Sequence, residues 1–224
     1  MWPVEAEELI GVQNDLATAA PEPWMPPPAG SVVGCWICFP RGLTGRGEAG
    51  DPAWAAAVAM SGGRVTGEHL TVGHAGAPYR PGLLALRIGP LLEQVVRGLP
   101  FVPDVLMVDA SGLDHPRRAG LAVHLGAVLS VPTVGITHRP LLAEGAWPVD
   151  REGATSPLRI GGETVGCWMR TASGTRPLVV HPGWRVDLVT AVEIVRETSV
   201  RRTPEPLRQA RQRARLAREA SRED

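Results

Sequence analysis

Two apolar runs on either side of a helix constrain this chain more than any other feature. The first, residues 103–109 (PDVLMVD), is largely aliphatic and ends in a carboxylate, which is typical of a central strand covered on both faces. A helix is predicted over residues 119–129, and residues 131–137 are again apolar and β-branched. A strand, a helix and a strand in this order predict a right-handed parallel crossover, and therefore an α/β fold.

Three strands are predicted before this unit. They cover residues 32–39, 54–60 and 64–72, and glycine-rich turns at 42–50 and 62–63 join them. Such short connections favour an antiparallel meander. A meander that leads into strand–helix–strand units is the order of a ribonuclease H-like fold, which has a mixed central sheet flanked by helices.

The remaining elements complete one domain with an extension at each end. A helix over 83–96 is opened by Pro81 and stopped by Gly98 and Pro100. Later elements are strands at 158–160, 164–170 and 177–180, and a helix at 187–196. We therefore expect an N-terminal helix with a proline-rich linker (1–30), a core domain (31–200) and an arginine-rich C-terminal helix (201–224).

The charged residues, the apolar runs and the cysteines indicate where the protein is located and which kinds of chemistry are excluded. Acidic and basic residues balance at 23 each, but residues 201–224 hold eight arginines against four acidic residues, and no lysine-dependent step is possible because the chain has no lysine. No apolar run reaches the roughly 18 residues that would span a bilayer, and residues 1–16 lack the pattern of a secretory signal, which predicts a cytoplasmic protein with no membrane partner. Cys35 and Cys38 lie in an apolar run, so we favour buried strand packing over metal or redox chemistry.

Asp109 is the first candidate for chemistry, because α/β sheets bind ligands at the carboxyl ends of their strands. The turn that follows it carries His115, Arg117 and Arg118, which can hold a phosphate against a metal-bound carboxylate. The alternative is a surface loop with solvated charges. The residues alone leave both interpretations open.

Four ordered segments resemble the endonuclease V family, whose members cut nucleic acid near deaminated purines. They are residues 78–87 (PYRPGLLALR), 103–124 (PDVLMVDASGLDHPRRAGLAVH), 132–136 (PTVGI), and a looser match from 180–183 (VHPG) to 204–208 (PEPLR). The resemblance implies the same ribonuclease H-like fold. It also implies that residues 78–81 form a wedge that separates nucleic-acid strands, with Tyr79 stacking on a base.

The resemblance also implies which residues contact the ligand and which have been replaced. Contacts to DNA or RNA are expected from Tyr79, Arg80, Pro81, Gly82, Arg117 and Arg118. Family positions for metal-binding carboxylates are occupied by Trp36 and Ile88, a family lysine by His138, and a family histidine by Trp184. Asp109 is then the only metal ligand left, and His115 survives beside it.

Three functions follow from this pattern. In the first, the protein binds nucleic acid with deaminated bases (inosine or deoxyinosine) through a retained groove and has weak or lost phosphodiester cleavage, because one carboxylate is a poor anchor for Mg²⁺ or Mn²⁺.

The second is an active metal-dependent endonuclease rebuilt around Asp109, with His115 and His138 as catalytic residues and Asp114, Glu68 or His69 as substitute ligands. The third is a repurposed domain that binds a protein or a small nucleotide-like metabolite in a dry pocket between Trp36 and Ile88. Nothing in the sequence predicts which protein would bind.

Overall fold

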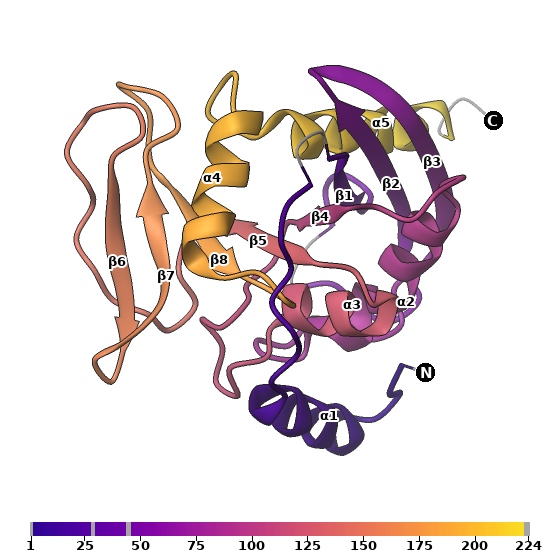
Figure 1. Cartoon of the computed structure of the whole chain (residues 1–224). Coiled ribbons are helices and arrows are strands. Elements are labelled where there is room, and N and C mark those ends of the chain that lie inside the picture. The colour runs from indigo at the N-terminus through magenta and orange to yellow at the C-terminus, as the bar shows by residue number, and fades with distance from the viewer. Residues whose placement is uncertain (1, 28–29, 44–45, 222–224) are drawn as a thin grey trace.

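The computed structural model describes residues 2–27, 30–43 and 46–221, and a single mixed sheet forms its centre (Figure 1). The strands are β1 (Val32–Cys38), β2 (Pro52–Ser61), β3 (Arg64–His74), β4 (Val105–Val108), β5 (Thr133–Thr137), β6 (Thr155–Ile160), β7 (Glu163–Met169) and β8 (Leu178–Pro182). Their order across the sheet is β3-β2-β1-β4-β5-β8-β7-β6. The sequence of strands along the chain and their order in the sheet together define the topology.

The strand directions confirm the predicted meander and crossover. β1, β2 and β3 are antiparallel neighbours, and Gly62 and Gly63 make the tight turn between β2 and β3 with positive φ angles of 55° and 76°. β4 pairs in parallel with both β1 and β5, whereas β8, β7 and β6 extend the sheet by antiparallel pairing. The carboxyl ends of β1, β4 and β5 therefore meet at one edge of the sheet.

Helices cover both faces of this sheet (Figure 1). They are α1 (Ala6–Thr18), α2 (Leu84–Arg97), α3 (Leu121–Leu129), α4 (Leu188–Thr198) and α5 (Glu205–Ala220). α2 and α3 pack on one face, with α1 outside them, and α4 and α5 pack on the other. The domain boundaries expected near residues 30 and 200 stay a prediction, although both terminal helices pack on the core.

Alternation along β1 divides the apolar core into two layers. Val33 and Cys35 belong to the cluster under α2 and α3, whereas Cys38 and Trp36 belong to the cluster under α5. Gly34 lies directly below the start of α5, and a Cβ there would lie 2.3 Å from the backbone carbonyl carbon of Pro206. The absence of a side chain therefore lets α5 lie directly against the sheet.

The mixed sheet with helices on both faces agrees with the ribonuclease H-like fold expected from the strand order. Most element boundaries differ by one to three residues from the expected ones. One of them has a visible cause: α3 begins at Leu121 rather than at residue 119, because the N–H of Gly120 donates to the carbonyl of Gly112. The cysteines are buried free thiols, as the apolar run predicted. Within the described ranges, every helix is too short or too polar to cross a bilayer.

Candidate functional site

The carbonyl oxygen of Gly82 is a point where three distant segments meet, just after the wedge segment (residues 78–81). Gln13 Nε2 on α1 donates to it at 3.2 Å, and Arg117 Nη2 donates at 2.9 Å. His115 Nε2 lies 3.1 Å from the same oxygen. Gly82 has a φ of +75°, which favours glycine. We call Gln13, Gly82, His115 and Arg117 the Gly82 cradle; it fixes the end of the wedge from two sides.

His115 is held in one tautomer inside this cradle. Its Nδ1 accepts the backbone N–H of Arg117 at 3.2 Å, so Nε2 carries the proton that it donates to Gly82. Only 3% of the residue is exposed, and burial lowers its pKa to about 4. The ring is neutral at pH 7 and both of its nitrogens are engaged within the cradle, and the catalytic role expected of His115 stays a prediction.

Arg87 fixes the other end of the wedge. Its buried guanidinium donates to the carbonyls of Glu48 and Ala77 at 2.7 and 2.8 Å and pairs with Asp51 at 2.6 Å. The hydrogen bond from Arg87 holds the pKa of the Asp51 carboxyl below its usual range. The ring of Phe39 lies 4.3 Å from the guanidinium carbon. This network ties the loop before β2 to the segment that enters the wedge.

The wedge itself presents Tyr79, Arg80 and Pro81 to solvent. Tyr79 is 38% exposed, and its backbone N–H donates to the carbonyl of Gly47 at 3.2 Å. Tyr79, Arg80 and Gly82 line a cavity of about 190 Å³ together with Asp109. The structure thus brings an aromatic ring, an exposed cation and the predicted carboxylate around one opening.

The two arginines of the turn after β4 lie apart. Arg117 is bound within the Gly82 cradle, and its Nε also donates to Gln13 Oε1 at 2.6 Å. Arg118 has a φ of 55° and pairs with Glu163 on β7 at 3.4 Å. Both side chains therefore have partners within the protein, and the contacts to nucleic acid expected of them stay a prediction.

Asp109 faces a donor rather than a second carboxylate. The register Cys35–Val108 between β1 and β4 places the next residues, Trp36 and Asp109, side by side, and the indole Nε1 donates to Asp109 Oδ2 at 2.8 Å. Beside them lies a pocket of about 20 Å³, which His138 also lines. Burial and then Arg202 lower the pKa of His138, so the ring is neutral at pH 7.

The residues present do not fit a magnesium or manganese site. Mg²⁺ requires octahedral oxygen ligands, and an indole N–H is a donor that cannot coordinate a cation. Within the described part of the chain, no group of three His, Cys, Asp or Glu side chains is arranged to hold a metal ion. Asp109 therefore has no protein ligand to share a divalent ion with.

The substitute ligands considered from the sequence are wrong. Asp114 is fully buried, and its two oxygens accept the backbone N–H groups of residues 141–143 at 2.6 to 2.9 Å. Glu68 pairs with Arg213 at 2.7 Å. Glu68 and its neighbour His69 lie on β3, three strands from β4 and on the order of 14 Å away at the usual strand spacing. None can join Asp109.

The dry pocket expected between Trp36 and Ile88 is also wrong. Trp36 packs in the cluster under α5, whereas Ile88 is 6% exposed and packs in the cluster under α2 and α3. The sheet separates these clusters, because successive side chains of a strand point to opposite faces. The two apolar replacements therefore cannot line one site.

Several residues of the site carry no sequence signal that predicts them. Gln13 is one polar position in an amphipathic helix, and it is only 2% exposed because it reaches the cradle. Arg87 ends the quoted wedge motif, and its Pro–x₅–Arg spacing from the wedge was the one available signal. Arg211 and Arg215 of α5 flank Trp36, with each guanidinium carbon 5.4 Å from the ring centre.

Comparison with known proteins agrees with this architecture. The family profile described as Endonuclease V matches residues 33–212. An endonuclease V from Streptomyces coelicolor is 36% identical over 214 residues, which cover 93% of this chain and 89% of that protein. One from Methanopyrus kandleri is 48% identical over 134 residues, covering 59% and 58%.

Solved structures are similar over nearly the whole chain. The crystal structure of endonuclease V from Streptomyces avermitilis has a TM-score of 0.87 and 34% identity, with 98% of this chain and 96% of that chain covered. The catalytic domain of human endonuclease V has a TM-score of 0.83 and 28% identity, with 98% of each chain covered.

Proposed function

The chain belongs to the endonuclease V family, and from that premise we propose that it binds nucleic acid containing deaminated bases while its phosphodiester cleavage is weak or lost. The family is one of nucleic-acid hydrolases. The two halves of the proposal rest on different parts of the molecule, namely the wedge and the carboxylate beside it.

The wedge supports binding. Tyr79 is exposed at the rim of the 190 Å³ cavity, where its ring can stack on a base, and Arg80 is exposed next to it. The Gly82 cradle and Arg87 hold both ends of the segment, so little ordering is needed when a ligand binds. A pre-formed cavity bordered by an aromatic ring and a cation suits a base with its phosphate.

One observation carries the proposed loss of cleavage: the indole of Trp36 donates its N–H to Asp109. A divalent ion at Asp109 would need further oxygen ligands at the place that this donor occupies. Losing metal stabilisation of the transition state costs several kcal/mol, which is on the order of a thousandfold in rate. The roles proposed for His115 and His138 in an active Mg²⁺ or Mn²⁺ enzyme lose support, since Asp114 and Glu68 are engaged elsewhere and His69 lies three strands from β4.

The test measures binding and cleavage in the same samples. The protein is incubated with inosine-containing and unmodified single- and double-stranded DNA and RNA, with Mg²⁺ or Mn²⁺. We expect salt-sensitive binding that prefers inosine, and cleavage at background in both the native protein and Asp109→Ala. Tyr79→Ala should weaken binding by about 1–3 kcal/mol, whereas Trp147→Ala, which removes another exposed aromatic ring, should not.

Two results would contradict the proposal. Cleavage that disappears in Asp109→Ala would show an active enzyme rebuilt around that residue. An absence of binding to all four nucleic acids would favour the repurposed domain.

A further inference from the structure

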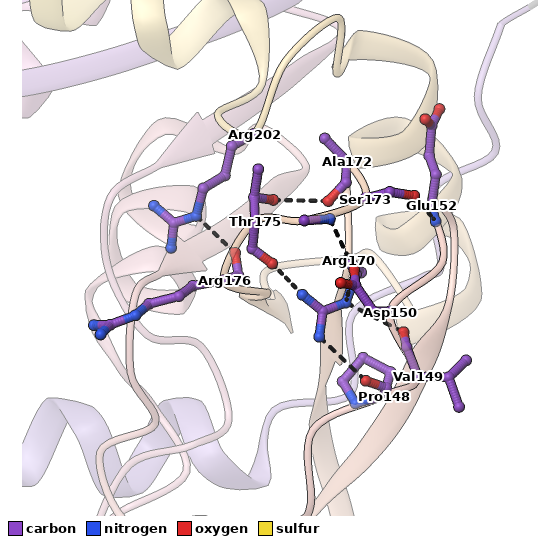
Figure 2. Close-up of polar contacts among 11 residues, drawn as sticks. Pro148, Val149, Asp150, Glu152, Arg170, Ala172, Ser173, Thr175, Arg176 and Arg202 are labelled. Carbon is purple, nitrogen blue, oxygen red and sulfur yellow. Dashed lines mark hydrogen bonds and ion pairs between the residues drawn. The ribbon is translucent and has the colours of Figure 1, made fainter.

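Arg211 lines the pocket beside Trp36, and three other arginines lie near it. Arg211 and Arg215 are one turn apart on α5 and both lie over the indole ring. Arg202 Nε donates to the carbonyl of Arg176 at 2.7 Å, and both side chains project to the same side of the loop between β7 and β8, away from Arg170 (Figure 2). We call Arg176, Arg202, Arg211 and Arg215 the arginine cluster.

No carboxylate that the structure describes forms an ion pair with this cluster. Among the residues that the structure describes, none of the four pairs with an acidic side chain within 4.0 Å, whereas Arg213 of the same helix pairs with Glu68. The Nε of Arg211 is buried without a hydrogen-bond partner in that same part of the chain. Leaving a charged donor desolvated and unsatisfied is unfavourable, so a missing acceptor is indicated.

The cations also repel one another. Burial, and then the charges of Arg176 and Arg211, lower the pKa of Arg202. Burial and Arg211 likewise lower the pKa of Arg215. The guanidinium groups remain protonated at pH 7, so the fold holds like charges together without a counterion. An anion at the pocket mouth would relieve this repulsion.

The nearby carboxylate does not serve as that anion. Asp109 lines the same pocket as Arg211 but forms no ion pair with it within 4.0 Å, and its oxygen accepts the N–H of Trp36 instead. Guanidinium groups match the geometry of phosphate oxygens, to which they donate paired hydrogen bonds. The pocket floor of about 20 Å³ holds roughly one water molecule, so a phosphate would bind at its mouth.

We propose that the arginine cluster is an anion site that binds a phosphate group of the ligand directly, at the end of the sheet where Asp109 lacks metal ligands. The identification of this phosphate as part of a nucleic-acid backbone rests on the proposed function. The anion site itself rests only on the arrangement of the cluster. Arginine charge then replaces divalent charge in holding the backbone, and it holds the phosphate without supplying a nucleophile.

The first experiment measures binding of an inosine-containing single-stranded oligonucleotide over a range of salt concentrations with a metal chelator present. The native protein should bind. Arg211→Gln/Arg215→Gln should bind at least about tenfold more weakly, with a log–log salt slope smaller by about 1 because phosphate contacts are lost. Arg213→Gln is the matched control from the same helix, and it should keep the native slope.

The second experiment uses inorganic phosphate, with chloride at the same ionic strength as the reference. Phosphate should raise the Tm of the native protein and of Arg213→Gln by mass action, but not that of the double variant. A phosphate response without oligonucleotide binding would support the anion site and contradict the proposed function.

Other outcomes overturn the anion site. Oligonucleotide binding with the same affinity and slope in the double variant and in Arg213→Gln would overturn it and leave the proposed function standing. An equal phosphate response in all three proteins would also overturn it. Failure of the native protein to respond to either ligand would overturn both proposals.

Discussion

The Gly82 cradle and the arginine cluster lie at the same edge of the sheet and use polar side chains in opposite ways. In the cradle, the side chains of Gln13 and Arg117 both donate hydrogen bonds to the backbone oxygen of Gly82, and His115 is buried and neutral. In the cluster, Arg211 keeps a buried donor without an acceptor and no described carboxylate pairs with it. The cradle therefore fixes the backbone of the wedge, whereas the proposed role of the cluster is to bind an anion.

This difference explains how a family member can keep one half of a site and change the other. Tyr79 depends on a rigid backbone, which the cradle and Arg87 supply without any metal. Asp109 depends on other carboxylates, and Trp36 occupies the position where the family resemblance places one. The proposed loss of metal binding and the proposed retention of the wedge therefore depend on separate sets of contacts.

The largest expected effect comes from returning a carboxylate to the position beside Asp109. Trp36→Asp should raise single-turnover cleavage of an inosine-containing oligonucleotide in Mn²⁺ by on the order of a thousandfold, because the new carboxylate lies next to Asp109 and can share a metal ion with it. Adding Asp109→Ala should return cleavage to background. Trp36 packs under α5, so urea unfolding must first establish that the variant folds. A folded variant with no gain would show that missing metal ligands are not the cause of weak cleavage.

Acid should remove the contribution that the buried His115 of the cradle makes to the free energy of unfolding. The pKa of His115 is about 4 in the fold and about 6.5 unfolded, so the unfolded chain takes up the proton first as pH falls. Its contribution, up to about 3 kcal/mol, is fully present above pH 6.5 and is lost between pH 6.5 and 4. Urea unfolding at pH 7.5 and 4.5 should show a smaller loss in His115→Gln than in the native protein. His74→Gln, at an exposed histidine at the end of β3, should follow the native curve; identical curves for all three would contradict the assignment.

Two carboxylates at this edge should differ in their effect on stability. Asp114→Ala leaves three backbone N–H groups without their acceptor and should lower the free energy of unfolding by about 2 kcal/mol. Asp109→Ala removes an exposed carboxylate with one indole partner and should cost less than about 1 kcal/mol. Denaturant melts at pH 7 measure both. Equal losses would mean that Asp109 is also a structural residue.

The smallest expected effect tests the link between α1 and the wedge. Gln13→Ala removes a donor to Gly82 and an acceptor for Arg117, and should lower the free energy of unfolding by about 1 kcal/mol. Oligonucleotide affinity should fall with it because the wedge is less ordered. Gln94→Ala, on the exposed side of α2, is the control and should change neither quantity. Affinity that stays native in Gln13→Ala would separate α1 from the wedge.

The sheet could be predicted because its signals are local. The apolar run before Asp109 and the glycine pair at 62–63 each define an element or turn within a few residues, and the strand order follows from connection lengths. The first residue of α3 was missed because Gly120 is held by Gly112, a contact outside the helix.

The site was harder to predict from the sequence, because its contacts join residues that are far apart in the chain. Family resemblance selected Trp36 and Asp109 as positions of interest, but only the β1–β4 register shows the indole bonding to the carboxylate. The composition indicated a basic tail but not which arginines have partners. The positions of these residues on α5 place Arg213 beside Glu68 and Arg211 at the pocket. No local pattern reports such pairings.

The hydrogen bond from Arg117 to Gln13 also determines when the wedge can form during translation. Gln13 leaves the ribosome 104 residues ahead of its partner, an interval of roughly 5 to 20 s at ordinary translation speeds. During that interval Gln13 lacks Arg117, and Gly82 lacks both Arg117 and His115. A nascent chain therefore gains a competent wedge only after the turn beyond β4 has emerged.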